Sequence, residues 1–489
     1  MGLLDKFKTK GAALGDQFGQ FPGLQKDSAQ ATYTAQPGQI QDLSLGPESV
    51  IRFRKQRGVN LGAWFSQEAW IVDEPFKSAA QPRSSDHDIA KAGGKEALER
   101  HWDNWIVEDD WKWIVEKGFN TVRLPIGYYH LSNPNACPAC LKKTDFEPFA
   151  QIYEGAWPRI EKAIQDAGRW GLGILIDLHG VAGNQNDDAH SGTSSGKTQL
   201  WDSKKNLEST SLALRFLAQH LARIPHVVGL QLMNEPKNNQ TLGGWYESTI
   251  RDLQFVVVDH HLYRCFTAED RGLSGDQHAQ VLSQQFRHTF ESWSKNAGRS
   301  LIVGEFSAAL DPHSFPQGCN DTEKDRQRRE FLRAQLNLYE EFCAGWYFWT
   351  LKKGNGWDAG WSAKDASTAE ILPGWVGGKV KRQNAGDGDR QPRLQHAFDS
   401  HAGYWSTQPG PKEHDRFWEG INRGWDDAVM FMDHRFGPQR ATSVIGFEGP
   451  WIRRRTIEHL QRRGQGPCVW EFEHGWRQGV AAAAEAFLI

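Results

Sequence analysis

The chain has 489 residues, of which 39% are hydrophobic and 24% are charged. This composition excludes a wholly disordered chain, and the length allows two to four domains or one large barrel with an appendage. The 57 basic and 60 acidic residues give a formal net charge of -3, which argues against a nucleic-acid-binding protein. No apolar run approaches the 18 residues of a membrane span.

Residues 1–50 are rich in Gln, Gly, Ala and Ser, and we expect them to form a flexible arm. The arm contains no sustained apolar segment of the kind that a secretory signal requires. We therefore expect a cytoplasmic protein with reduced thiols. The CPAC motif at Cys137 and Cys140 provides only two of the four ligands of a structural zinc site, so we expect no metal there.

Seven short apolar runs, separated by helical segments, follow one another from residue 57 to residue 352. They span 57–64, 119–127, 173–180, 227–236, 254–263, 300–310 and 345–352. Alternating strands and helices predict parallel strands with helical crossovers. An alternation repeated this often predicts an α/β protein with a (β/α)8 TIM barrel.

One unit of that barrel is missing from the sequence. Only 18 residues separate Pro236 from Phe255, whereas a helix, a strand and a second helix need about 30. The segment holds one helix and little else, so we expect a barrel that is one β/α unit short. Either the gene model lacks a segment in 237–254, or the deletion is real and weakens the closure of the barrel.

The pattern changes after the seventh run. Residues 354–392 are rich in Gly, Asp and Lys and predict long loops, and residues 393–489 predict helices. Two related segments, 417–428 and 472–483, each place glycines four residues apart, which allows close contact between helices. We favour a structural extension over a separate binding module. The expected division is an N-terminal arm (1–50), a barrel (51–365) and a loop-rich, helical extension (366–489).

Two glutamates suit the chemistry of glycosidic bond cleavage. Glu235 ends one predicted strand and Glu305 ends another, so both are expected at the same mouth of the barrel. Cleavage needs one protonated and one ionised carboxyl group. The 22 Trp, 26 Phe and 9 Tyr residues also suit a carbohydrate-binding protein, because aromatic rings match the flat faces of sugars.

Further polar and aromatic side chains end the neighbouring strands. Asn234 is suited to bind a sugar 2-hydroxyl, and Arg123 to hold a carboxylate ionised through a charge-assisted bond. His261 and Tyr263 share one face of a strand, from which Tyr263 can reach Glu305. His179 is a candidate for binding sugar or positioning the carboxylates, and Trp349 for the floor of the first sugar subsite.

The motifs RGVNLGAW, TVRLPIGYY, LIDLHG, LQLMNEP, VVDHHLY, IVGEF and WYFWTLK occur in this order along 57–365. In this the chain resembles glycoside hydrolase family 5, in particular the fungal exo-β-1,3-glucanases, and its tail resembles that of intracellular fungal glucan 1,3-β-glucosidases. The resemblance implies retaining double displacement, with Glu235 as acid/base, Glu305 as nucleophile, and no metal or cofactor. It also implies that the substrate-binding residues are Arg123, His179, Asn234, His261, Tyr263 and Trp349.

Three hypotheses follow. The first is an exo-acting β-glucosidase on β-1,3-glucan, with roles in glucan catabolism and cell wall organisation. The second keeps the chemistry but changes the substrate to a glycolipid or to an aryl or flavonoid glycoside, because the loop after the third strand (HGVAGNQNDDAHSG) differs from that of the secreted exo-glucanases. The third, motivated by the missing unit, is a catalytically impaired glycan-binding protein. The sequence does not determine the oligomeric state.

Overall fold

The structure is a computed structural model and describes residues 49–250, 257–382 and 389–489. The predicted arm at 1–50 therefore lies outside the described residues, except for its last two positions. The first residues of the predicted strand at 254–263 also lie outside them.

Seven parallel strands form one curled sheet in the order β4-β3-β2-β1-β7-β6-β5. The strands are β1 (Gln56–Asn60), β2 (Thr121–Gly127), β3 (Gly173–Gly180), β4 (Val227–Gln231), β5 (Val258–Leu262), β6 (Leu301–Phe306) and β7 (Gly345–Phe348). Each coincides with one of the seven predicted runs. The side chains of β2, β3 and β6 are buried along their whole length, which explains their continuous apolar character.

The sheet is a half-barrel with two edges. Among the described residues no strand pairing joins β4 to β5, and the link between them contains a single helix, α9 (Leu242–Ile250). Removing one β/α unit after the fourth strand of a (β/α)8 barrel leaves this strand order. The predicted fold class, a TIM barrel one unit short, is confirmed.

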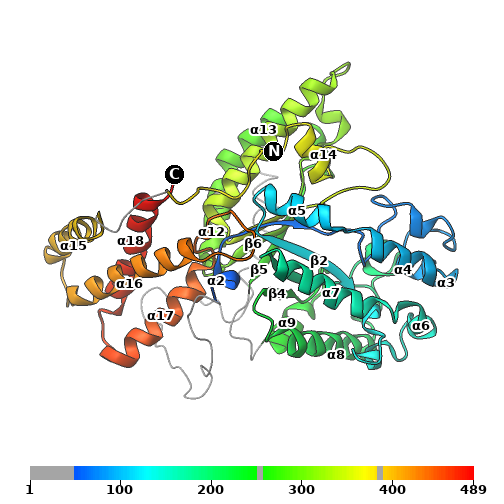
Figure 1. The fold of residues 1–489 in the computed structure, drawn as a ribbon, viewed down its shortest axis with the longest axis horizontal. Coiled ribbons are helices and arrows are strands. Elements are labelled where there is room, and N and C mark those ends of the chain that lie inside the picture. Colours follow the sequence, from blue (N-terminus) through cyan, green and yellow to red (C-terminus); the bar gives the residue numbers. More distant parts are fainter. Residues whose placement is uncertain (1–48, 251–256, 383–388) are drawn as a thin grey trace.

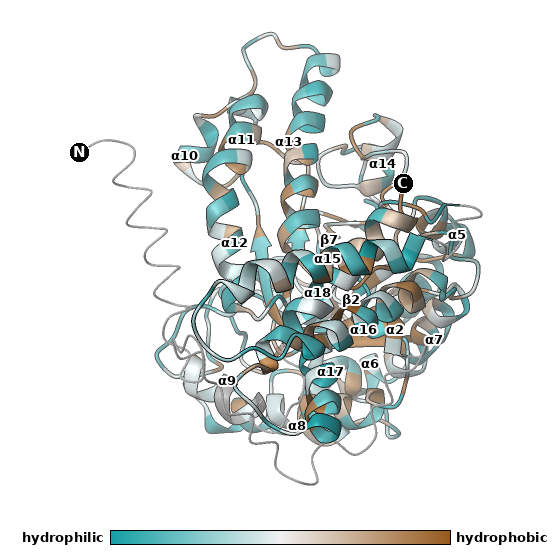
Figure 2. Ribbon diagram, turned by 90° about the vertical axis from the view of Figure 1, so that its left-hand side faces the viewer, coloured by the Kyte–Doolittle hydropathy of each residue, from teal (hydrophilic) through white to brown (hydrophobic). Residues whose placement is uncertain are grey.

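Helices cross over between the strands (Figure 1). In chain order they are α3 (Asp86–Lys91), α4 (Lys95–Asn104), α5 (Glu108–Glu116), α6 (Ala150–Tyr153), α7 (Ala156–Arg169), α8 (Lys204–Leu221), α9, α10 (Ala268–Arg271), α11 (Gly275–Val281), α12 (Arg287–Asn296) and α13 (Asp321–Phe342). Helix α7 shows why they pack on the sheet: its buried residues recur at helical spacing, at Trp157, Ile160, Ala163, Ile164 and Ala167. Helices α11, α12 and α13 rise together from the sheet, and the upper turns of α13 are hydrophilic (Figure 2).

The C-terminal region consists of α15 (Arg390–Ser406), α16 (His414–Asp433), α17 (Glu448–Arg463) and α18 (Val469–Phe487). Helices α16 and α18 cross at the predicted glycines. A Cβ atom on Gly424 would lie 2.0 Å from the carbonyl oxygen of Trp476, and one on Gly479 would lie 2.0 Å from that of Ile421. The glycines therefore let the two backbones touch, as their spacing predicted.

Helices α16, α17 and α18 lie against the end of the sheet opposite the strand C-termini, beside the short helix α2 (Val50–Phe53), and α15 packs on α16 and α18 farther from the sheet (Figure 1). One apolar cluster joins Leu175 and Tyr347 of the strands to Phe431 and Trp451 of the helices. Arg54 also forms a β-bridge with Ile445. This shared core favours a structural extension. The exact boundaries at 365 and 366 stay a prediction, and the predicted loop region 354–392 also contains a short helix, α14 (Ala363–Thr368).

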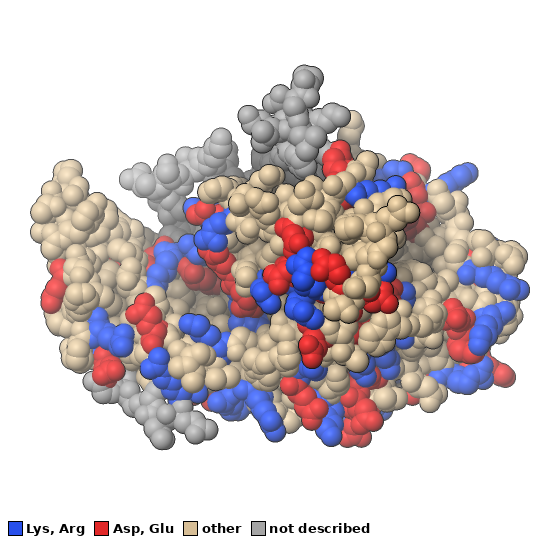
Figure 3. Space-filling model, turned by 90° about the horizontal axis from the view of Figure 1, so that it is seen from above, with Lys and Arg blue, Asp and Glu red and all other residues tan. Residues whose placement is uncertain are grey.

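Basic and acidic side chains are interspersed on the face seen in Figure 3. None of the helices within the described ranges combines the length and the apolar character needed to cross a membrane.

Candidate active site

The eight predicted site residues come together at the C-terminal ends of the strands. Arg123 lies in β2, His179 in β3, His261 in β5 and Glu305 in β6. The others follow the ends of strands: Asn234, Glu235, Tyr263 and Trp349. A continuous series of contacts links all eight. In a parallel α/β barrel this end of the sheet is where active sites form.

Two hydrogen-bond donors hold the carboxylate of Glu305. Nη1 of Arg123 donates to Oε1 at 2.8 Å, and the hydroxyl group of Tyr263 donates to Oε2 at 2.7 Å. The Glu305 side chain is only 6% exposed. Both of its oxygens are therefore fixed in orientation, and a charge-assisted bond stabilises the ionised form.

Arg123 is fully buried and organises the floor of the site. Besides Glu305, its guanidinium donates to Asn234 at 2.9 Å and forms an ion pair with Asp177 at 2.9 Å. Burial disfavours its charged form, but the carboxylates of Asp177 and Glu305 outweigh burial and raise the pKa of Arg123. The guanidinium group is thus a permanent cation. It orients the amide of Asn234 and the carboxylates of Asp177 and Glu305.

Glu235 forms a pair with His261. Oε1 of Glu235 lies 2.7 Å from Nδ1 of His261. Burial alone would raise the pKa of Glu235, but the bond to His261 lowers it to about 2. Burial opposes the charged imidazole, yet Glu305 and Asp259 raise the pKa of His261 well above its usual value. The shared proton of the pair therefore sits on the imidazole.

The two glutamates face each other across His261. One carboxylate oxygen of Glu235, one of Glu305 and a ring nitrogen of His261 all lie within 4.8 Å of one another. Glu235 has a φ of 43°, a left-handed conformation that non-glycine residues adopt at a cost and that is concentrated at functional sites. The strained turn after β4 aims the carboxylate at the mouth of the half-barrel.

These three side chains are also close enough to bind one metal ion. The donor set argues against it at this position, because Arg123 and Tyr263 already bond both oxygens of Glu305. The permanent cation of Arg123 would also repel a second one.

His179 and Trp349 line the other side of the site. Their rings are stacked, with centroids 5.9 Å apart and an interplanar angle of 6°. Nδ1 of His179 lies 2.7 Å from Asp177, which fixes the ring and leaves Nε2 without a hydrogen-bond partner among the described residues.

Glu68 belongs to the site, although the sequence analysis missed it. It lies in the loop after β1, and its Oε2 accepts a 2.7 Å hydrogen bond from Nε1 of Trp70. Burial raises the pKa of Glu68 to about 7, with His179 acting in the opposite direction and Glu305 adding to the rise. Its Oε1 is buried and has no partner in the described part of the chain. The only sequence signal was an acidic residue inside the aromatic run that follows the first strand.

The loop after β3 also reaches the site. Nδ2 of Asn186 donates to the backbone carbonyl oxygen of Glu235 at 3.0 Å. Nε2 of His190 lies 3.8 Å from the carboxylate of Glu235. The sequence identified this loop as unusual but did not assign a role to either residue.

Aromatic side chains surround the mouth of the site. Trp361 contacts Trp70, Tyr263 and Phe266, with ring centroids 5.2, 5.3 and 6.1 Å away. Phe266 is 64% exposed. This cluster provides aromatic, apolar surface next to Tyr263, the partner of Glu305, which suits a sugar ring or an aromatic group.

Two protein-family models match the chain. Residues 90–260 match cellulase (glycosyl hydrolase family 5), and residues 387–487 match the glucan 1,3-beta-glucosidase 3 C-terminal domain. The first match contains Glu235, and the second covers the four C-terminal helices.

Curated proteins match over longer stretches. The chain is 31% identical over 477 residues to glucan 1,3-beta-glucosidase 3 of Schizosaccharomyces pombe, a match that covers 88% of this chain and 96% of that protein. It is 25% identical to an uncharacterized glycosyl hydrolase of Saccharomyces cerevisiae, covering 89% and 92%. It is 27% identical to a glucan 1,3-beta-glucosidase of Blumeria graminis, covering 65% and 87%.

Proposed function

Because this chain belongs to glycoside hydrolase family 5, we propose that it cleaves β-glucosidic bonds by double displacement at the mouth of its half-barrel. The observation that carries the proposal is the proximity of the two glutamates: one carboxylate oxygen of Glu235 lies within 4.8 Å of one of Glu305. Retaining glycosidases hold their carboxyl groups about 5–5.5 Å apart, whereas inverting enzymes need about 6.5–9.5 Å to admit a water molecule. The geometry therefore supports retention of configuration.

Glu305 acts as the nucleophile in this mechanism. Arg123 and Tyr263 hold its carboxylate in one orientation, one donor on each oxygen. In the first step, an oxygen of Glu305 attacks the anomeric carbon and forms a glycosyl–enzyme ester while the bond to the leaving group breaks. Arg123 donates to one oxygen of Glu305 and Tyr263 to the other, so the oxygen that does not attack keeps its donor while the ester forms and is later hydrolysed.

Glu235 acts as the acid and then as the base. It gives a proton to the leaving oxygen in the first step and takes one from the attacking water in the second. The hydrogen bond to His261 supplies that proton, because the pair holds one proton that can lie on either partner. Both steps use only side chains of the chain and water.

Three buried polar atoms around the carboxylates support recognition of a sugar. Nδ2 of Asn234, Nε2 of His179 and Oε1 of Glu68 have no hydrogen-bond partner among the described residues. Buried polar groups without a partner are costly, and sugar hydroxyls at this position would satisfy all three. Asn234 adjoins Glu235 and is placed to bind the 2-hydroxyl.

We propose β-1,3-glucan, attacked from its end, as the substrate class. The support is the similarity to the glucan 1,3-beta-glucosidases of S. pombe and B. graminis. An aryl or flavonoid glycoside, or a glycolipid, is the second candidate, favoured by the exposed ring of Phe266 beside Trp361. An impaired glycan-binding protein is the third, favoured by the edges of the sheet at β4 and β5, which have no pairing partner among the described residues.

We also propose that the protein works in the cytoplasm. All six cysteines are free, as expected in a reducing compartment. Fractionation of cells that express the tagged full chain tests this location, and recovery of the protein in the medium or the cell wall would contradict it.

The test is turnover of an aryl β-glucoside by the purified chain, with laminarin and a glucosylceramide assayed in parallel. Proton NMR of the first sugar released reports its anomeric configuration. We expect the β-anomer, and Glu305→Gln is expected to lower kcat by at least about 10³-fold, the order of loss seen when a nucleophile is removed.

The outcomes separate the candidates. Release of the α-anomer would exclude double displacement. Turnover of laminarin supports the glucan substrate, and turnover of only the aryl glycoside or the lipid supports the second candidate. No turnover by a chain that melts cooperatively and binds laminarin supports the impaired binder.

A further inference from the structure

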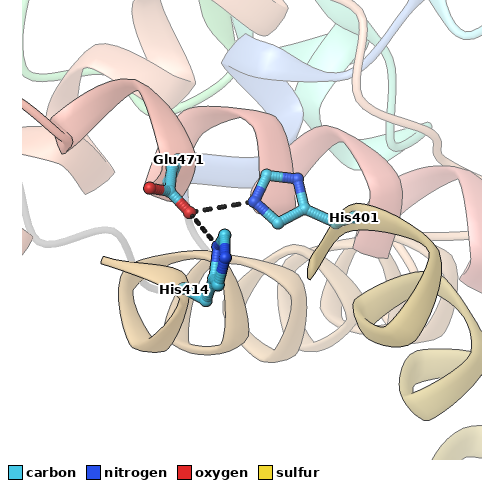
Figure 4. A group of neighbouring side chains, drawn as sticks. All are labelled: His401, His414 and Glu471. Atoms are coloured by element: carbon cyan, nitrogen blue, oxygen red, sulfur yellow. Dashed lines mark hydrogen bonds and ion pairs between the residues drawn. The ribbon is translucent and has the colours of Figure 1, made fainter. Parts of the chain in front are cut away.

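The C-terminal helices bring two histidines and a glutamate together far from the glycosidase site. His401 lies near the end of α15, His414 begins α16, and Glu471 lies in the first turn of α18. Figure 4 shows both imidazoles pointing at one oxygen of the Glu471 carboxylate. One ligand atom from each of the three residues lies within 4.8 Å of the other two.

The contacts are short and converge on a single atom. Oε2 of Glu471 lies 2.9 Å from Nε2 of His401 and 2.8 Å from Nδ1 of His414. Oε1 of Glu471 accepts a 2.8 Å hydrogen bond from the backbone N–H of Glu413, which orients the carboxylate. The ring of His401 is stacked on Phe417, with centroids 3.8 Å apart, so this ligand is also held in place.

The charge of Glu471 needs compensation. Its side chain is 0% exposed, and within the described residues its only ion-pair partners are the two imidazoles. No Lys or Arg side chain of the described ranges forms an ion pair with it. A buried carboxylate is costly unless it is paired or coordinates a metal, so a cation bound at this position would stabilise it.

We infer that His401, His414 and Glu471 form a binding site for a divalent transition metal of the zinc type, which joins α15, α16 and α18. The donor set of two imidazoles and one carboxylate is one that zinc uses. Ligands about 2.0–2.1 Å from a tetrahedral ion lie about 3.3 Å apart, so the present separations need to open by only about half an ångström. The ion takes the place of the protons that now lie between the nitrogens and the oxygen.

The surroundings supply the rest of a coordination shell. His414 is 25% exposed, which gives the ion a path from solvent and leaves a position for a water molecule. His474 lies one turn after Glu471 on the same helix, and its ring is 5.2 Å from that of His401. A Glu-x-x-His pair on one helix face is a metal-binding arrangement in helical bundles, and Glu471 and His474 have this spacing on α18.

The metal has a structural role in this proposal. Of the three helices that it joins, α16 and α18 lie against the end of the sheet opposite the glycosidase site, and α15 packs on these two helices farther from the sheet (Figure 1). The site is therefore independent of glycoside hydrolysis, and we expect metal to change the melting temperature and not the turnover of an aryl glucoside well below that temperature.

Metal uptake by the purified full chain tests the proposal. The protein is stripped with a chelator, incubated with excess ZnCl₂, desalted and analysed for metal. We expect one zinc ion per chain and a melting temperature that rises with zinc. His414→Asn should weaken zinc binding about 100-fold or more, since changes in the surroundings of ligands already cost 10–100-fold.

Two controls locate the ion. His396→Asn removes an exposed histidine of α15 and should leave zinc binding unchanged. Glu305→Gln alters the carboxylate cluster of the glycosidase site and should also leave the stoichiometry at one. If His414→Asn fails to fold, X-ray absorption of the zinc-loaded natural chain must show two imidazole ligands.

Three results would overturn the proposal. Zinc that is not retained after desalting, with no rise in the melting temperature, would mean that the cluster is a hydrogen-bonded triad only. Equal retention by His414→Asn, or loss of the ion in Glu305→Gln, would place the metal elsewhere.

Discussion

Nδ1 of His261 lies 2.7 Å from Oε1 of Glu235, and the opposite pKa shifts of the two groups favour the shared proton on the imidazole. The lowered pKa of Glu235, about 2, and the raised pKa of His261 are two aspects of this one arrangement. A glycosidase that starts from this state must move the proton across the hydrogen bond before or during cleavage. In the proposed mechanism, His261 therefore sets the pH at which Glu235 can act as the acid.

The first prediction concerns the alkaline limit of activity. In the natural chain the pair keeps its last proton up to the raised pKa of His261. In His261→Asn, Glu235 stands alone and loses its proton at its own pKa. The alkaline limb of the kcat/KM profile is therefore expected to move to lower pH, and kcat at pH 7 to fall by about 10²–10⁴-fold, the usual contribution of positioned proton transfer.

His190→Asn is the matched control for this measurement. Its Nε2 lies 3.8 Å from the Glu235 carboxylate without a hydrogen bond to it, so its removal should shift the limb less than His261→Asn does. An alkaline limb that stays in place in His261→Asn would exclude the shared proton as the source of the acid.

The second prediction concerns Arg123. Arg123→Met leaves the carboxylates of Asp177 and Glu305 buried without their cation, and breaking a buried pair in this way costs about 3–5 kcal/mol of stability. Arg123→Lys keeps a positive charge but loses the planar guanidinium group that bonds several partners at once. Its free energy of unfolding should therefore lie between that of the natural chain and that of Arg123→Met. Urea unfolding gives the stability, and aryl glucoside turnover gives the activity. Equal stability of all three proteins would contradict the role of Arg123 as the organiser of the site.

The third prediction separates activity from stability at Glu68. We expect Glu68→Gln to lower kcat/KM by about 10–150-fold, because a hydrogen bond from a sugar to a charged group contributes about 1.5–3 kcal/mol. The folded-state pKa of about 7 is above the usual value for a carboxyl group. The ionised form therefore opposes folding, and its cost appears as the pH rises from about 4.5 to 7 and persists above.

Glu68→Gln removes that cost. Its melting temperature should exceed that of the natural chain at pH 8 and equal it at pH 4. Lower activity together with higher stability is the pattern expected of a strained binding residue. A melting temperature that falls at pH 8 would show that Glu68 is mainly structural.

The seven strands, and the position of the eight predicted site residues at one end of them, could be predicted from the sequence for one reason. Buried parallel strands form continuous apolar runs, and a residue such as Glu305 is conspicuous where such a run ends. The short interval after Pro236 also predicted the open edges at β4 and β5, because chain length limits what a connection can contain.

Other features depend on contacts between distant segments. Glu68 lies in a loop, and only the fold places it near Glu305. Its shifted pKa comes from burial, which no local pattern reveals. Only the fold brings Trp451 into one apolar cluster with Leu175. It also brings His401 of α15 into contact with Glu471 of α18. Amphipathic spacing predicts that a helix packs, but not what it packs against.

The last prediction concerns the crossing of α16 and α18. A Cβ atom on Gly424 would lie 2.0 Å from a backbone oxygen of Trp476, so Gly424→Ala must push the helices apart. Overpacking of this kind costs about 1–3 kcal/mol. Gly403→Ala is the matched control, since Gly403 lies in α15 with nothing within 4 Å of its added Cβ atom. There alanine should stabilise the helix by about 0.5–1 kcal/mol. Thermal melting of both variants tests the contrast, and equal effects would mean that the two backbones are not in contact at these glycines.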